Sequence, residues 1–211
     1  MSSSKSRQQR GPLRGQSPVE TISTKVEGRF GYWKHSSLQS VFEAEAAGAG
    51  GVYVWCVEIS GRYRTYMVGE GACMGRRLMV HLTNCLSGCY AVYRAEKFVV
   101  GEKSSRIYGL REESCRQSGN YKYCDLTELM QRRQELRPEI DSMLEAFRIF
   151  LIPVDHQRVR QRLEAKLIRQ LETVSWGNTR RGVVPRSDEE SKLILIACEV
   201  DIEKLPSQLE I

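Results

Sequence analysis

The alternation of apolar and polar positions predicts a β-hairpin followed by an amphipathic helix in the first half of the chain. Residues 52–59 (VYVWCVEI) are β-branched and aromatic, which favours a strand, and Ser60-Gly61 follows as a turn signal. The returning strand is expected over 63–69 (YRTYMVG). Leucines then recur at helical spacing in 76–86, so we expect this segment to be a helix.

Further periodic segments predict the remaining elements. The clearest helix is expected over 156–174, where Asp155 is a suitable N-cap and five apolar residues form one stripe along the helix. Strands are expected at 91–100, 106–110, 147–154 and 193–200, and helices at 36–46 and 125–136, with a further helical piece beginning at Pro138.

Composition is that of a soluble globular protein, and charge adds a weak preference for an anionic partner. Of the 211 residues, 41% are apolar and 27% are charged, and no apolar run approaches the roughly 18 residues that a membrane span requires. Residues 1–18 are basic and polar without an apolar segment, so we expect a disordered arm rather than a secretory signal. The net charge of +6 favours nucleic acid as a partner.

The cysteines and histidines do not form a recognisable metal-binding motif. The seven cysteines include no C-x-x-C pair, and the three histidines, His35, His81 and His156, are scattered along the chain. A zinc site is therefore unsupported, and we expect free thiols in a reducing, cytoplasmic compartment.

Two predicted helices carry candidate chemistry. Arg77 and His81 are four residues apart, so they project from one helix face and could bind a phosphate together; the alternative is a solvated helix flank. Glu164 lies on the apolar side of its helix, where a carboxylate is costly unless it is paired or binds a cation such as Mg²⁺. The alternative for Glu164 is an edge position paired with Arg160 or with neighbours of Lys166.

The glycine-rich stretch VGEGACMG matches neither the dinucleotide-binding fingerprint nor a P-loop in its spacing. We expect Gly69, Gly71 and Gly75 only to let the chain turn tightly between strand and helix. No Ser-His-Asp or Cys-His arrangement is suggested by spacing alone.

Several of these residues resemble, in order, the motifs of the GIY-YIG nuclease superfamily. Gly51-Val52-Tyr53 followed by Met67-Val68-Gly69 is similar to the paired motif of that family. Members carry an arginine eight residues after the second glycine, a histidine four residues further on, and later a Glu-x-x-Leu-Ile helix segment with an asparagine after it. The corresponding residues here are Arg77, His81, Glu164 and Asn178, and the resemblance covers about 51–82 and 147–180.

By this resemblance we expect an α+β fold, in which helices flank a small, mainly antiparallel sheet. The nuclease domain is expected over 50–200, with a core at 50–87 and 147–200. Residues 88–146 resemble an insertion of the kind that carries sequence recognition in restriction-type members. Residues 19–49 are expected to form an N-terminal extension, and 201–211 a C-terminal tail.

The resemblance implies Mg²⁺-dependent hydrolysis of a DNA phosphodiester bond. Tyr53 would act as general base, and Arg77 would stabilise the charge on the phosphate. His81 would orient Tyr53 or share a proton with it. Glu164 would hold the single Mg²⁺, and Asn178 would position a ligand or the backbone.

The chain departs from the family pattern at the second tyrosine. The register places Met67 at that position, and Tyr66 stands one residue earlier. In a regular strand Tyr66 would point to the opposite face from Met67, so we expect the site to work without a hydroxyl there. The alternative is a β-bulge that turns Tyr66 back to take over the role.

Double-stranded DNA is the expected partner, and a homodimer would let two sites cut both strands. The alternatives are a non-catalytic nucleic-acid-binding module on the same fold and an unrelated α+β interaction protein in which the motif is coincidental. Non-specific phosphate contacts are expected from basic residues of the arm and of the first helix, namely Lys5, Arg7, Arg10, Arg14 and Arg76.

Overall fold

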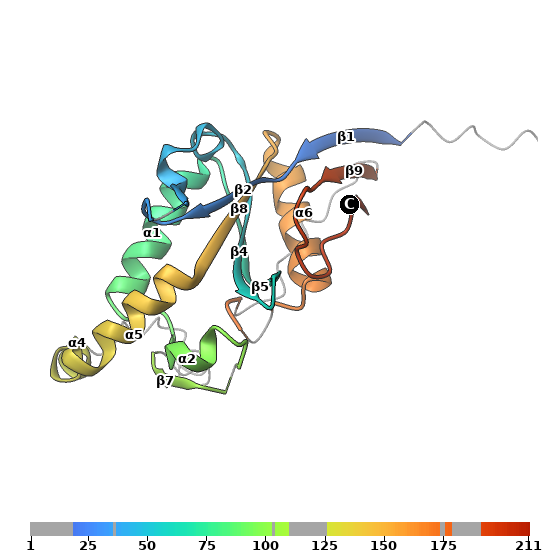
Figure 1. Cartoon of the computed structure of the whole chain (residues 1–211). Coiled ribbons are helices and arrows are strands. Elements are labelled where there is room, and N and C mark those ends of the chain that lie inside the picture. Colours follow the sequence, from blue (N-terminus) through green and yellow to red (C-terminus); the bar gives the residue numbers. More distant parts are fainter. Residues whose placement is uncertain (1–18, 36, 103, 110–125, 174–175, 179–190) are drawn as a thin grey trace, which may run out of the picture.

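A five-stranded sheet forms the centre of the protein (Figure 1). The computed structural model describes residues 19–35, 37–102, 104–109, 126–173, 176–178 and 191–211. The strands lie in the order β3-β2-β8-β4-β5, and only β2 and β3 run parallel to each other. Their bounds are β2 Glu27–Gly31, β3 Gln39–Ser40, β4 Gly51–Ile59, β5 Arg62–Gly71 and β8 Phe147–Pro153. The predicted hairpin and the strand predicted at 147–154 are therefore confirmed.

The central strand β4 is buried on both faces of the sheet. Tyr53, Trp55 and Val57 face one apolar cluster, whereas Val52 and Val54 face another. All five side chains are at most 1% exposed. Two-sided burial explains the uninterrupted apolar run of β4, since a strand with one wet face would alternate with polar residues.

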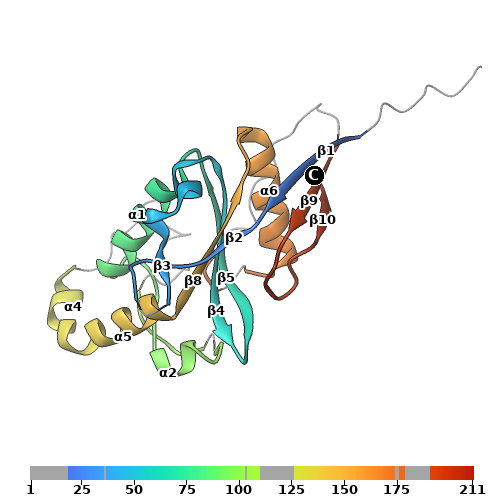
Figure 2. The same ribbon diagram turned by 45° about the horizontal axis from the view of Figure 1, so that its top comes forward.

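Helices cover the two faces unequally (Figures 1 and 2). The face of Trp55 is covered by α1 (Met74–Leu86), α2 (Ala95–Phe98) and α5 (Arg133–Ala146). The opposite face is covered by α6 (Gln157–Gln170), which is backed by a second sheet in the order β1-β9-β10. The bounds of that sheet are β1 Glu20–Lys25, β9 Lys192–Ala197 and β10 Gln208–Glu210.

The expected α+β class is confirmed, but the sheets are mixed rather than purely antiparallel. In the second sheet, β1 and β9 are parallel, and β10 is antiparallel to β9. Residues 201–211, expected as a tail, contribute β10 and the buried Ile211 to this layer. Within the described residues, no helix is long and apolar enough to cross a membrane.

Two predicted elements are wrong for local reasons. Residues 91–100, expected as one strand, form β6 (Val92–Tyr93) and then α2, because the Glu139 carboxylate accepts the Ala95 N–H at 2.7 Å and caps the helix. An α-helix is expected over 36–46, but the described part of this segment contains β3 followed by two short 3₁₀ turns. The first, η1, is Val41–Glu43, and the second, η2, is Glu45–Gly48.

The other helix boundaries shift by a few residues. The N-cap of α6 is His156 rather than Asp155, because the Arg160 side chain donates to the Asp155 carbonyl oxygen and holds that residue outside the helix. Helix α4 (Leu126–Gln131) precedes α5, which runs through Pro138 instead of beginning there. The strand expected at 106–110 is confirmed as β7, Arg106–Tyr108.

A β-bulge interrupts the pairing of β4 with β5 at Tyr66. Trp55 lies opposite Met67 and Cys56 lies opposite Thr65, so Tyr66 has no partner across the ladder. The extra residue leaves both Tyr66 and Met67 facing the cluster around Trp55. The expectation that Tyr66 points to the opposite face is therefore wrong, and the bulge alternative describes the strand.

The free edge of β5 is covered beside this bulge by residues 176–178. The Gly177 N–H donates to the Tyr66 carbonyl at 3.0 Å. The Asn178 side chain accepts the Val68 N–H at 2.9 Å and donates to the Val68 carbonyl at 2.8 Å. The amide of Asn178 thus replaces the two hydrogen bonds that a neighbouring strand would make.

Asn178→Asp is expected to destabilise the edge of β5 more than Asn178→Ala does. The aspartate keeps the acceptor for Val68 but loses the donor and places a carboxylate oxygen against the Val68 carbonyl. We expect a loss of about 1–3 kcal/mol in the free energy of unfolding, measured by urea denaturation. A smaller loss for the aspartate than for the alanine variant would contradict the paired geometry.

Candidate active site

Tyr53 and His81 meet at the open end of the β4–β5 hairpin, where β4 begins and β5 finishes. The Tyr53 hydroxyl lies 2.6 Å from His81 Nε2, and the two side chains are 1% and 5% exposed. Tyr53 is paired across the strands with Gly69, and any Cβ at position 69 would overlap the Tyr53 ring and hydroxyl. The expectation that this glycine serves a turn is wrong: Gly69 lies within β5 and makes room for Tyr53.

Arg77 completes this group from the first turns of α1. It is exposed, and Gly71 leaves space for it, because a Cβ on Gly71 would lie 3.3 Å from Arg77 Cβ. Burial raises the pKa of Tyr53 above its usual range, while the charge and hydrogen bonding of the nearby Arg77 guanidinium oppose that rise. Burial, and to a smaller extent Arg77, lowers the pKa of His81 to about 4. At neutral pH the site therefore contains a neutral phenol and a neutral imidazole beside an exposed cation.

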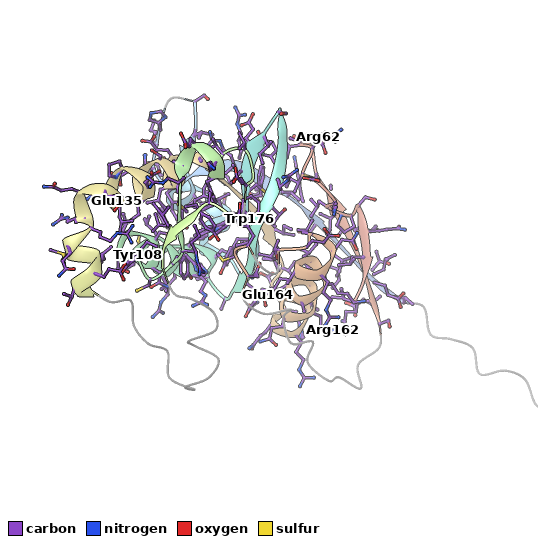
Figure 3. The ribbon with its side chains drawn as sticks, turned by 90° about the horizontal axis from the view of Figure 1, so that it is seen from below. Arg62, Tyr108, Glu135, Arg162, Glu164 and Trp176 are labelled. Carbon is purple, nitrogen blue, oxygen red and sulfur yellow. The ribbon has the colours of Figure 1, made fainter. Side chains whose placement is uncertain are left out.

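Glu164 reaches the same end of the hairpin from the opposite layer. It is half-buried on α6, and Figure 3 shows it on the side of the helix that faces the sheet. Burial raises the pKa of Glu164 to about 7, and the charge of Glu70 adds to the rise. The Arg77 charge and the Glu70 backbone N–H partly offset these effects. Glu164 thus lies within electrostatic reach of Arg77 and Tyr53.

The alternative in which Glu164 pairs with Arg160 is wrong. The buried Arg160 guanidinium binds Glu70 instead, with 3.3 Å between Nε and Oε2. It also donates to the carbonyl oxygens of Val154 and Asp155. These contacts use the cation that could have neutralised Glu164, and no ion pair reaches Glu164 from the described residues.

Tyr90 is a member of the site that the sequence did not indicate. Its hydroxyl hydrogen-bonds to His81 Nδ1, so the imidazole bridges two tyrosines, Tyr53 and Tyr90. Helix α1 ends at Leu86, and Tyr90 follows in a turn, so helical spacing carries no signal of this contact.

Tyr53, His81, Arg77 and Glu164 form the polar group of the candidate site. The bulge does not bring Tyr66 into this polar group. Its ring packs at centroid distances of 5.1–5.5 Å against Phe98, Phe147 and Trp176, in the aromatic part of the core. Figure 3 shows Trp176 in this region, away from Glu164. Burial raises the pKa of Tyr66 well above its usual value. The ring contacts place Tyr66 in the packing that supports β5 rather than beside Tyr53.

The remaining candidate residues lie outside the polar group or outside the described residues. Arg76 is exposed on α1, one position before Arg77. Asn178 binds the backbone of Val68, next to Gly69, and so supports the strand that carries the site. The expected DNA contacts of the N-terminal arm fall on residues 1–18, which the structure does not describe: Lys5, Arg7, Arg10 and Arg14.

Comparison with protein-family models, with curated proteins and with solved structures found no match for this chain. Within the described residues, no group of three or more histidine, cysteine, aspartate or glutamate side chains is arranged to hold a metal ion.

Glu164→Gln is expected to stabilise the metal-free protein in a pH-dependent way. Because folding raises the Glu164 pKa from 4.5 to about 7, wild type has no penalty below pH 4.5 and loses stability as the pH rises through 7. The glutamine variant avoids that loss, so it should be more stable above pH 7 by on the order of 1–3 kcal/mol after solvent screening.

The measurement is urea denaturation in EDTA at pH 4.5 and at pH 8. Glu199→Gln is the matched control, because it removes the charge of an exposed glutamate, whose ion pair is with Lys25. An equal difference between wild type and Glu164→Gln at both pH values would rule out a raised Glu164 pKa.

Proposed function

We propose that this protein is a Mg²⁺-dependent endonuclease that hydrolyses phosphodiester bonds in double-stranded DNA. The observation that carries the proposal is the convergence of Tyr53, His81, Arg77 and Glu164 at one end of the β4–β5 hairpin. These four residues come from three elements and are among those through which the sequence resembles GIY-YIG nucleases. The basic net charge of +6 agrees with an anionic substrate.

The donor set suits Mg²⁺ better than a structural zinc ion. Glu164 is a half-buried carboxylate without an ion-pair partner among the described residues, and the like charge of Glu70 adds to the rise in its pKa. Mg²⁺ is commonly held by one or two carboxylates together with waters and substrate phosphate oxygens. When bound, the cation would neutralise phosphate charge and assist departure of the leaving oxygen.

Tyr53 and His81 would move the proton of the attacking water in two linked transfers. Because burial keeps Tyr53 protonated, the residue is not a tyrosinate before the reaction begins. As its hydroxyl proton passes to His81 Nε2, the Tyr53 oxygen takes a proton from the water, and the resulting hydroxide attacks phosphorus. The displaced oxygen of the nucleic acid leaves with the electrons of the broken P–O bond.

Arg77 would bind the phosphate and adjust His81 at the same time. Its exposed guanidinium can bond two phosphate oxygens and stabilise the charge that develops on them. In the free protein the Arg77 charge lowers the pKa of His81. An anionic substrate on Arg77 would weaken that effect, so His81 would become a better proton acceptor when DNA is bound.

The direct test is incubation of pure protein with supercoiled plasmid in Mg²⁺ or in EDTA. We expect cleavage in Mg²⁺ alone, and its loss in Glu164→Gln but not in the control Glu199→Gln. Salt-sensitive DNA binding without cleavage would favour the non-catalytic module. No binding and no cleavage would favour an unrelated interaction protein. Linear product without a nicked intermediate would support the proposed homodimer, since both strands are then cut together.

Arg77→Ala is expected to lower the cleavage rate by orders of magnitude while leaving DNA binding largely intact. Arg76 provides the matched control, because it is the adjacent arginine but points about 100° away around α1. Arg76→Ala should therefore mainly weaken binding. The measurements are single-turnover cleavage and a gel-shift titration. A larger loss of turnover in Arg76→Ala would reverse the two assignments.

A further inference from the structure

The turn after α1 brings Tyr90 back to His81. The Cys89 and Tyr90 N–H groups both donate to the Asn84 carbonyl, at 2.9 and 3.3 Å, so the chain folds back over the last turn of the helix. Gly88 permits this turn with a φ of +67°. The turn places the Tyr90 hydroxyl on His81 Nδ1.

The His81 ring is held between aromatic side chains that restrict its position. Its centroid lies 5.5 Å from that of Tyr53, 5.4 Å from that of Trp55 and 5.7 Å from that of Tyr90. Packing therefore sets the place of the ring. A neutral imidazole still has two tautomers, and the hydrogen bonds at its two nitrogens decide between them.

The surroundings of Tyr53 favour one tautomer. The Tyr53 hydroxyl is buried, and the neighbouring Arg77 guanidinium can only donate hydrogen bonds. The Tyr53 proton therefore has its best acceptor in His81 Nε2, which must then be unprotonated. The imidazole proton is left on Nδ1, where it needs an acceptor, because a buried N–H without a partner is costly.

We propose that Tyr90 is a positioning residue that accepts the Nδ1 proton of His81 and so keeps Nε2 free to receive the Tyr53 proton. Tyr90 is half-buried, and a phenol oxygen can accept a hydrogen bond from Nδ1 while its own proton is donated elsewhere. The catalytic consequence of this role rests on the proposed nuclease function, whereas the tautomer itself does not.

The tautomer can be measured without any substrate. Imidazole nitrogens with and without a proton differ widely in ¹⁵N chemical shift, and the chain has only three histidines. In wild type, labelled at histidine and kept near pH 7, we expect His81 to have a protonated Nδ1 and an unprotonated Nε2. His81→Gln assigns the signals. A protonated Nε2 in wild type would overturn the proposal before any other variant is made.

Tyr90→Phe and Tyr32→Phe form a matched pair of variants. The Tyr32 hydroxyl is buried and has no hydrogen-bond partner among the described residues, and its ring also packs on Trp55. Tyr90→Phe should shift the His81 signals toward the tautomer protonated at Nε2, whereas Tyr32→Phe should leave them unchanged. Unchanged His81 signals in a folded Tyr90→Phe protein would overturn the proposal.

Cleavage kinetics separate this inference from the proposed function. If wild type cuts DNA, Tyr90→Phe should lower kcat by about 10–100-fold with little change in KM, because the proton acceptor is then in the wrong tautomer. A shifted tautomer with an unchanged kcat would refute the positioning role. If wild type does not cut DNA, the nuclease proposal fails, and the NMR comparison still decides whether Tyr90 sets the tautomer.

Discussion

The hydrogen bond between Tyr53 and His81 is the contact on which the arrangement of the candidate site depends. It joins the central sheet to α1, and it forms only because Gly69 leaves the space opposite Tyr53 empty. The same absence of side chains at Gly69 and Gly71 brings Arg77 close to the hydroxyl. The polar group of the candidate site can thus lie beside a densely packed aromatic core, and no extra segment in the sheet is needed to make room for it.

The position of β5 at the edge of the sheet lets two layers contribute to one site. Tyr53, His81 and Arg77 belong to one face, and Glu164 comes from the helix on the other. In the middle of the sheet, neighbouring strands would keep these groups apart. At the edge, the backbone of residues 69–71, which carries the side chain of Glu70 between two glycines, lies between them.

The sequence predicted the parts of this site that depend on regular periodicity. Arg77 and His81 share a helix face, and Glu164 falls on an apolar stripe, so spacing made them candidates and the family resemblance selected them. The sequence offered the bulge at Tyr66 only as an alternative, because one extra residue in a buried strand leaves its apolar pattern unchanged. The Tyr90 contact depends on a turn, and tertiary contacts outside the helix set the pairing of Arg160 with Glu70.

The fold class and most long elements followed from the same periodicity, whereas short elements did not. Residues 91–100 have the composition of a strand, yet Ala95–Phe98 are helical, and the Ala95 N–H donates to Glu139, 44 positions away. A contact between residues far apart in sequence can override the local preference of a short element. Only a few hydrogen bonds within such an element oppose the change. Long, two-sided strands such as β4 resist the same effect, because many buried side chains fix their conformation.

The pairing of β1 with β9 has a consequence for the order of folding. Glu20 and Lys192 are partners in this ladder although they stand 172 positions apart in sequence. Closing so long a loop has a high entropic cost, and contacts of this separation slow folding. During synthesis, the layer that backs α6 cannot close until almost the whole chain has emerged. The β4–β5 hairpin and α1 are close neighbours in sequence, so Tyr53 and His81 can meet well before Glu164 is held in place.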